Sequence, residues 1–145
     1  LYCAPADTYI DPTRAVPRAI VTHGHSDHAR AGHRSVLATA ETLQIMAVRY
    51  GEDFAGGSQV AADGEPLAVG DVRVTLYPAG HVLGSAQILL EYGGACAVVS
   101  GDYKRASDPT CTPFELVPCD VFITEATFGL PVFRQPPVSR EIAKL

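Results

Sequence analysis

The stretch Thr22-His23-Gly24-His25-Ser26-Asp27-His28-Ala29 decides how this sequence is interpreted. It places four potential metal ligands within six residues, directly after the apolar run Ala19-Ile20-Val21. The apolar run is typical of a short buried strand, so the ligands follow a strand end, where the chain turns. Borderline ions such as zinc take nitrogen and carboxylate oxygen ligands of this kind. This spacing favours a metal site over a polar loop with ordinary histidines.

The spacing inside the stretch also favours two neighbouring metal ions. In extended backbone, side chains two residues apart share a face, so His23 and His25 point the same way. If the chain bends next, Asp27 and His28 turn towards a second point close by. One loop would then supply an imidazole pair for one ion, and a carboxylate with an imidazole for the other.

Length and composition indicate one globular domain. The 145 residues are 47% hydrophobic and 19% charged, which argues against disorder. The formal net charge of −5 does not indicate a nucleic-acid-binding surface, but this count omits the positive charge that bound metal ions would add. No apolar run reaches the length of a membrane span, so we expect no membrane partner.

The cysteines and the ends of the sequence indicate where the protein acts and how much of it is present. Cys3, Cys96, Cys111 and Cys119 form no Cys-x-x-Cys pair, and we interpret them as reduced structural thiols of a cytoplasmic protein. Cys3 is expected to pack rather than to lie beside a metal. The sequence starts at Leu1 rather than Met and ends in an interrupted helix pattern, so we expect a piece of a longer chain.

Short strands and one helix account for most of the chain. Strands are expected at 2–3, 8–10, 19–21, 35–38, 59–61, 66–69, 72–77, 86–92, 95–99 and 121–124, the last of them buried. Gly93-Gly94 is a two-residue hairpin signal. A helix is predicted from Ala40 to about Tyr50, with Thr39 as N-cap and Gly51 as its stop. Its apolar residues recur every three or four positions, so one face should pack on the core.

Potential ligands also follow other predicted strands. His81 lies in the interruption before the strand at 86–92, Asp102 follows the strand at 95–99, and Glu125 follows the strand at 121–124. Loops at one edge of a β scaffold hold such groups rigidly. One zinc site needs at least three protein ligands and an open position for water. Three histidines would complete that set: His23, His25 and His81. A second set, one ligand short, begins with Asp27, His28 and a bridging Asp102.

Two further polar residues are considered beside this cluster. Asp11 either orients a ligating histidine or caps the turn that begins at Pro12. His33 lies outside the cluster, and we expect it to be solvated or to contact a phosphate rather than to bind metal.

The ligand motifs resemble those of the metallo-β-lactamase superfamily, in the order His23-x-His25-x-Asp27-His28, then His81, then Asp102. Three stretches resemble the histidine, aspartate and acidic motifs of its β-CASP nucleases: 79–86, 100–105 and 124–129. The opening at 1–12 is most similar to the bacterial DNA-ligase-associated exonucleases. The resemblance implies an α/β fold, the metallo-β-lactamase αββα sandwich, of which this chain would be the N-terminal half only, β-rich with few helices.

The resemblance also implies what is missing. Residues 1–133 would form a partial metallo-β-lactamase domain, and residues 134–145 a linker and the start of a helix leading to an absent β-CASP domain. Later histidine motifs, one of which supplies the last ligand of the second metal in this family, are absent. We therefore expect this chain alone to be weakly active or inactive.

The function implied by the resemblance is metal-dependent phosphodiester cleavage, as an exonuclease acting on DNA or RNA. Two divalent ions, zinc first and manganese as the alternative, would share a bridging hydroxide that attacks phosphorus. Asp27 would accept the proton, and Glu125 would orient a histidine or position the phosphate. DNA is favoured over RNA as the partner, with a DNA ligase or helicase repair system as a possible setting.

Other functions stay open at this point. A small-molecule metallo-hydrolase of the same superfamily would use the same ligands on a thioester, lactone or lactam. An inactive scaffold of a nucleic-acid-processing complex would have lost the reaction. The loops around His81 and Glu125 favour the nuclease over the first, and the intact ligand set favours it over the second. Glu125 also has a plain alternative, as a strand-end carboxylate in solvent.

Overall fold

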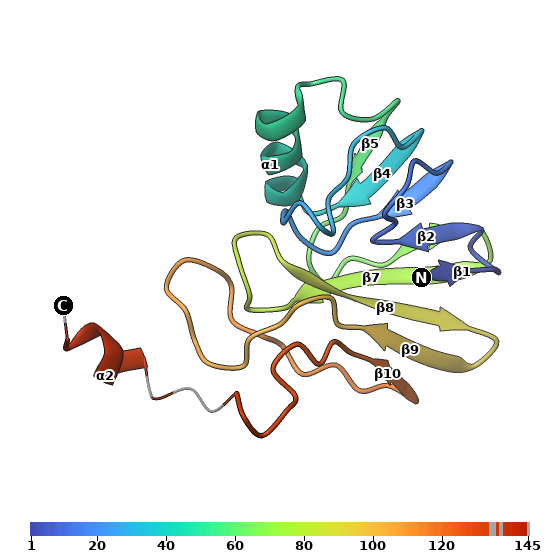
Figure 1. The fold of residues 1–145 in the computed structure, drawn as a ribbon. Coiled ribbons are helices and arrows are strands. Elements are labelled where there is room, and N and C mark those ends of the chain that lie inside the picture. The colour runs from blue at the N-terminus through green and yellow to red at the C-terminus, as the bar shows by residue number, and fades with distance from the viewer. Residues whose placement is uncertain (134–135, 137, 145) are drawn as a thin grey trace.

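The computed structural model describes residues 1–133, 136 and 138–144, in which two five-stranded sheets face each other (Figure 1). The first sheet has its strands in chain order: β1 (Tyr2–Cys3), β2 (Thr8–Ile10), β3 (Arg18–Ile20), β4 (Ser35–Ala38) and β5 (Ser58–Val60). The second has the order β10 (Val121–Ile123), β9 (Ala95–Val99), β8 (Ala86–Tyr92), β7 (Val72–Pro78) and β6 (Leu67–Val69). Each predicted strand is confirmed to within a residue at either end.

The first sheet is mostly parallel, and this brings its loops together. Strands β2 to β5 run parallel, while β1 pairs antiparallel with β2 as the first hairpin. Alternate residues of β3 face opposite sides: Ile20 packs towards the second sheet and Ala19 towards the helix. The carboxyl ends of β2, β3 and β4 therefore share one edge, which is where the histidine stretch begins.

Helix α1 (Ala40–Tyr50) covers the outer face of the first sheet (Figure 1). The Thr39 side chain accepts a hydrogen bond from the backbone N–H of Thr42, and Gly51 ends the helix with φ of 94°. Leu43 and Met46 are buried against the sheet, as the helical spacing predicts. The layers are thus helix, sheet, sheet, which confirms the predicted β-rich α/β architecture.

Two apolar cores hold these layers together. The larger lies between the sheets: Ala6, Ile10, Ile20, Leu37, Ala61, Val72, Val74, Leu76, Ala86, Ile88 and Val99. Cys3 packs at its edge, and all four cysteines are free in the part of the chain that the structure describes. The smaller core lies between the first sheet and α1: Ala19, Val21, Ala29, Val36, Ala38, Leu43, Met46 and Phe54.

The second sheet is antiparallel from β6 to β9, with β10 added in parallel. Gly93 and Gly94 have φ values of 60° and 84°, which the two-residue hairpin between β8 and β9 requires. The prediction that 121–124 is buried is wrong, because the three β10 residues are 40–53% exposed. β10 is the edge strand, and in the described residues no helix covers it.

Past β10 the chain has little regular structure. Helix α2 (Val138–Ile142) begins where a helix was predicted. Of the predicted linker, residues 134, 135 and 137 lie outside the described residues. None of the helices among the described residues is both long and apolar enough to cross a membrane.

Candidate metal centre

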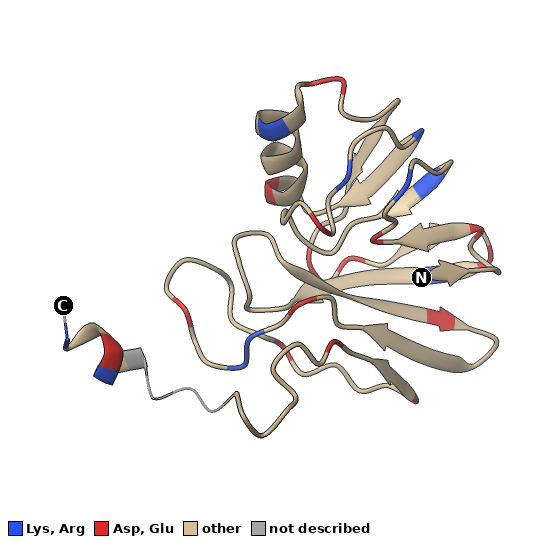
Figure 2. Cartoon of the chain, viewed as in Figure 1, with Lys and Arg blue, Asp and Glu red and all other residues tan. Residues whose placement is uncertain are grey.

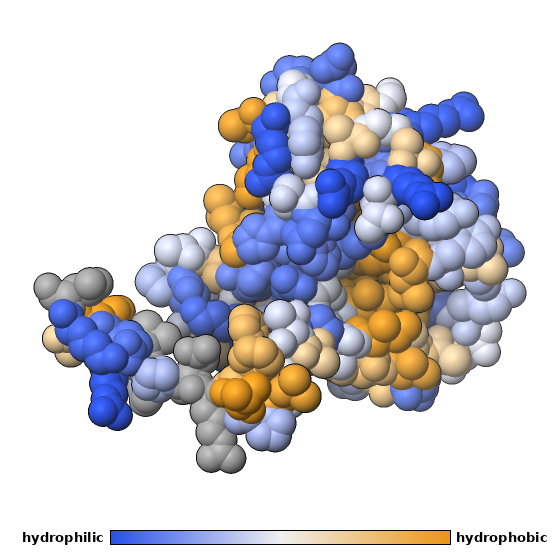
Figure 3. All heavy atoms as spheres, in the orientation of Figure 1, coloured by the Kyte–Doolittle hydropathy of each residue, from blue (hydrophilic) through white to orange (hydrophobic). Residues whose placement is uncertain are grey.

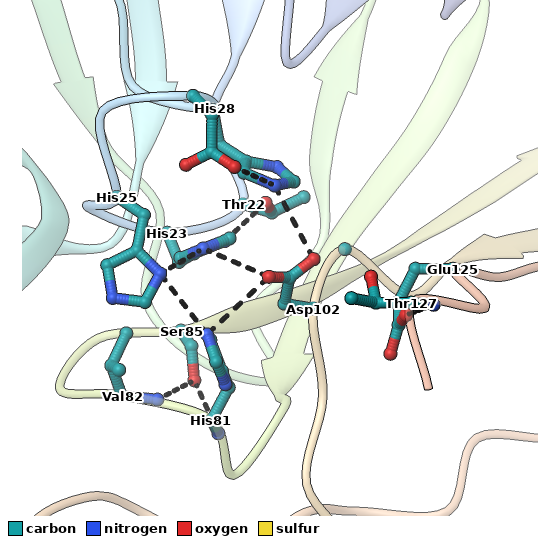
Figure 4. A network of polar contacts seen from close by, with 12 residues as sticks. Thr22, His23, His25, His28, His81, Val82, Ser85, Asp102, Glu125 and Thr127 are labelled. Carbon is teal, nitrogen blue, oxygen red and sulfur yellow. Dashed lines mark hydrogen bonds and ion pairs between the residues drawn. The ribbon is translucent and has the colours of Figure 1, made fainter. Parts of the chain in front are cut away.

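Loops from both sheets meet at the edge where the parallel strands end. His23, His25 and His28 follow β3, while His81 follows β7 and Asp102 follows β9. Figure 4 shows their side chains converging from the two sheets, with Asp102 between the histidines. The structure thus brings together residues that are up to 79 positions apart in the sequence (23 to 102).

Three histidines form one side of the site, named here the histidine side: His23, His25 and His81. The His25 Nδ1 atom lies 3.1 Å from His23 Nε2 and 3.2 Å from His81 Nε2. Asp102 Oδ2 lies 3.8 Å from His23 Nε2 and 3.6 Å from His81 Nε2. These four ligand atoms all lie within 4.8 Å of one another. Ligands about 2.1 Å from a tetrahedral zinc ion are about 3.4 Å apart, so the donor set fits such an ion.

The protonation of His23 suits metal binding. Thr22 Oγ1 donates to Asp11 Oδ2 at 2.6 Å, so it accepts from His23 Nδ1 at 3.0 Å. The proton on Nδ1 leaves a lone pair on Nε2, which faces the other ligands. Burial lowers the pKa of His23 to about 3, which keeps the ring neutral.

The other side of the site, named here the acidic side, consists of Asp27, His28 and the Oδ1 atom of Asp102. His28 Nε2 lies 3.4 Å from Asp102 Oδ1 and 3.7 Å from Asp27 Oδ2. Asp102 therefore presents one oxygen to each side, as a bridging carboxylate must. The Asp27 side chain is 74% exposed, and a hydrogen bond from its own backbone N–H holds its pKa below its usual range.

Asp11 holds the ring of His28, one of the predicted ligands, and this favours the first of the two roles considered for Asp11 over capping the turn at Pro12. Its Oδ2 lies 2.8 Å from His28 Nδ1, and its Oδ1 accepts from the backbone N–H of Thr22 at 2.8 Å. The Asp11 hydrogen bond raises the pKa of His28 and turns its Nε2 towards Asp102. Asp11 itself has φ of 44°, a strained value for a residue other than glycine.

Glu125 lies near the site but makes other contacts. Its Oε2 accepts from the backbone N–H of Thr127 at 2.6 Å, and among the described residues it makes no hydrogen bond to a histidine. In Figure 4 it lies on the far side of Asp102 from His25. Its proposed role beside the phosphate therefore remains a prediction.

The prediction that His33 is solvated or contacts a phosphate is wrong. The ring is 1% exposed, and its Nδ1 accepts from the backbone N–H of Val16 at 3.2 Å. The His33 backbone also pairs with Ala55: the Gly32 N–H donates to the Phe54 carbonyl and the Gly56 N–H donates to the His33 carbonyl. Burial lowers the pKa of His33, so the ring is a neutral structural group.

Sequence reasoning missed the residues that hold the ligand loops. The Thr22 side chain contacts Asp11 and His23. The Thr22 backbone carbonyl accepts from the Ala86 backbone N–H at 2.8 Å, which ties the end of β3 to the second sheet. Ser85 Oγ accepts from the backbone N–H groups of His81 and Val82 and so closes the His81 loop. Both residues stand inside the recognised motifs, and a polar side chain beside a ligand is the signal that could have found them.

A cleft of about 260 Å³ opens beside the acidic side, between the two sheets. Leu1, Ile10, Val99 and Ile123 contribute apolar lining to this cleft. His28, Asp102 and Glu125 contribute polar lining. Figure 3 shows an apolar area on this face, between polar surroundings. Figure 2 shows Lys and Arg scattered over the chain rather than gathered in one basic band.

Comparison with known proteins tests the predicted resemblance. A "Probable DNA ligase" of Opitutus terrae is 34% identical over 145 residues, which is 97% of this chain and 14% of that protein. The endoribonuclease ysh1 of Aspergillus fumigatus is 41% identical over 78 residues, or 52% of this chain and 9% of that protein. The solved Rm3 metallo-β-lactamase has a TM-score of 0.54 at 21% identity, covering 76% of this chain and 56% of its own.

The chain has the metallo-β-lactamase fold, and the predicted resemblance to the metallo-β-lactamase superfamily is confirmed. The predicted resemblance to its β-CASP nuclease branch is confirmed. The Zn²⁺-bound PqqB of Methylobacterium extorquens has the same fold, with a TM-score of 0.52 at 16% identity over 65% of this chain and 40% of its own. No family model matches the sequence. The chain spans a small part of its sequence relatives, 14% and 9% of the two named above.

Proposed function

We propose that this chain carries the catalytic residues of a metal-dependent phosphodiesterase that cleaves nucleic acid, with DNA as the favoured substrate. The observation that carries this proposal is the position of Asp102, with one oxygen facing His23 and His81 and the other facing His28. A carboxylate shared between two ligand sets is what a two-ion site needs. The names of the relatives, a probable DNA ligase and an endoribonuclease, support nucleic acid as the substrate class.

Six residues would hold two divalent ions, zinc first and manganese as the alternative: His23, His25, Asp27, His28, His81 and Asp102. When bound, the ions would activate a water molecule and neutralise charge on the phosphoryl oxygens. The buried Thr22 and the half-buried Asp11 fix the rings of His23 and His28 by hydrogen bonds to their Nδ1 atoms.

Asp27 is the proton acceptor in this proposal. It is solvent-exposed and ionised at neutral pH, and its carboxylate lies at the mouth of the acidic side. Attack of water oxygen on phosphorus breaks one P–O ester bond. A carboxylate beside that water takes up the proton it releases, and the departing oxygen takes a proton from solvent. Glu125 lines the cleft beside the acidic side, where it would orient a histidine or position the phosphate.

We also propose that residues 1–133 form part of a catalytic domain that a longer protein completes. This proposal is supported by the small part of each relative that the chain covers, 14% and 9%. The Asp102 oxygen on the histidine side would be a fourth ligand there, whereas the acidic side has three ligands in all, so a ligand from elsewhere would complete it. A DNA ligase or helicase repair system is a fitting setting, and weak activity of the chain alone is expected.

The test is cleavage of end-labelled oligonucleotides by the full-length protein with zinc or manganese. Single-stranded and duplex DNA and RNA are compared with a thioester and a β-lactam. Asp102→Asn should abolish cleavage. Asp71→Asn should not, because Asp71 is an exposed turn carboxylate at the opposite end of β7 from His81. Turnover of the small molecules without oligonucleotide cleavage, or full cleavage by Asp102→Asn, would overturn the proposal.

A further inference from the structure

We infer that helix α1 positions the metal centre by holding the two histidine loops at a fixed separation. This inference rests on the proposed metal site, because these loops carry His23, His25 and His81. Side chains of α1 or its N-cap donate to two backbone carbonyls of the first loop and to one of the second, and each loop has a glycine packed against the helix. The helix therefore contacts both loops at once, from its two ends.

The C-terminal turn of α1 holds the loop after β3. Arg49 Nη1 donates to the carbonyl of Gly24, the residue between His23 and His25, at 2.5 Å. Tyr50 Oη donates to the carbonyl of Ala29, the residue after the last ligand of this loop, at 2.8 Å. The Arg49 guanidinium also lies 5.7 Å from the centre of the Tyr50 ring, so the two contacts support each other.

The N-terminal turn of α1 holds the loop after β7. The hydroxyls of Thr39 and Thr42 both donate to the carbonyl of Gly84, at 2.7 and 3.0 Å. Both threonines are buried, so the two hydroxyl donors are shielded from water. Gly84 follows His81 by three residues, within the loop that Ser85 closes.

The two glycines leave no space between the loops and the helix. A Cβ at Gly24 would come within 2.8 Å of the Ile45 side chain, and one at Gly84 within 2.7 Å of Glu41 Cβ. Gly84 also has φ of 73°, which disfavours any other residue. Each loop thus rests directly on α1, and the helix length sets the distance between them.

This arrangement matters most for His25. Its side chain is exposed, so core packing does not fix the ring, yet its Nδ1 lies close to both other histidines of the histidine side. The Arg49 contact to Gly24 holds the backbone directly before it. Ligand constellations need placement within about 0.5 Å, so a shift of this loop relative to His81 would weaken the site.

The experiment measures zinc affinity by competition with a chromogenic chelator, for three variants that each remove a donor and a fourth that retains one. Arg49→Met removes the donor to Gly24 and should weaken zinc binding about 10-fold, at the lower end of the effects of removing a supporting contact. Tyr50→Phe and Thr42→Val each remove one hydroxyl at nearly constant volume, so they should weaken it less. Arg49→Lys keeps a donor and should restore part of the loss.

Matched controls change the same groups far from the site. Arg73→Met alters an exposed arginine paired with Glu91 on the second sheet, and Tyr92→Phe alters an exposed tyrosine at the far end of β8. Both should bind zinc as the unsubstituted chain does. Thermal melting of the metal-free proteins separates lost folding from lost positioning.

The outcomes separate this inference from the proposed function. Zinc affinity unchanged in all three variants, with or without a lower melting temperature, would overturn the positioning role and leave the metal site standing. An unsubstituted chain that binds no zinc would overturn the metal site and the positioning role together. Weaker binding in the variants alone, with metal-free melting temperatures close to those of the controls, is the expected result.

Discussion

The histidine side and the acidic side of the site are built from loops at the same edge, yet the chain supports them unequally. His23 is fully buried, and its loop is held by Thr22, Arg49 and Tyr50. Asp27 is 74% exposed, and the acidic side opens into the cleft between the sheets. In the proposed two-ion site, this difference indicates that the chain preorganises the first position, whereas the second would depend on a further ligand.

The largest effect should come from removing a ligand of the histidine side. His81→Ala leaves two histidines and Asp102, and should weaken tight zinc binding by more than about 100-fold, since loss of a supporting residue alone costs 10–100-fold. Zinc titration against a chelator measures this. The circular dichroism spectrum should stay unchanged, because His81 lies in a loop outside both apolar cores. If His81→Ala still bound zinc tightly, the histidine side could not be the tight zinc site.

A smaller effect is expected on the acidic side. Asp27→Ala should remove a weak second zinc-binding event and leave the tight one intact, because Asp27 lies away from the three clustered histidines. The same titration resolves the two events. Loss of the tight event instead would show that the two sides do not bind independently.

Asp11→Asn should act through His28 rather than directly. The amide keeps the shape of the carboxylate but weakens the hydrogen bond that orients the ring and raises its pKa. The second zinc-binding event should weaken about 10-fold. Asp7→Asn, which alters the other carboxylate at a residue with positive φ, is the matched control. Equal behaviour of the two variants would argue against an orienting role.

The smallest effect concerns pH. Burial lowers the pKa of His23, His33 and His81, so the unfolded chain takes up more protons than the folded one as pH falls through about 6.5. The hydrogen bond of His28 to Asp11 raises its pKa and acts in the opposite direction. With three groups against one, the metal-free chain should melt at a lower temperature at pH 5 than at pH 7.5.

Replacing His33 tests how much one buried histidine contributes to this pH dependence. His33→Asn replaces the acceptor for the Val16 N–H without a titrating ring, so the melting temperature should fall less steeply with acid. The variant leaves every proposed ligand in place, so zinc binding at neutral pH should not change. A melting temperature that rises as the pH falls would contradict the assignment of buried, neutral histidines.

Local patterns in the sequence predicted the strands and the ligand set. The His23 to His28 stretch can be recognised in the sequence because its potential ligands are close together in the chain and follow an apolar strand. His81 and Asp102 could be added because each also follows a strand and stands in a recognised motif. The structure brings these residues together where strand ends from both sheets meet.

Contacts between distant segments could not be predicted in the same way. Orienting a histidine was one of two roles predicted for Asp11, but no local pattern signals that it reaches His28, 17 residues away, from a backbone with positive φ. Thr42 reaches Gly84 across 42 residues. His33 was misjudged because loops remote in sequence close over it, and β10 was misjudged because its apolar residues lie at an edge.

The most direct test of the account is the metal content of the chain after gentle purification, by elemental analysis, beside His81→Ala. The account predicts close to one zinc per chain for the unsubstituted protein and little or none for the variant. Equal metal in both proteins, or none in either, would contradict the claim that His23, His25, His81 and Asp102 form a metal centre.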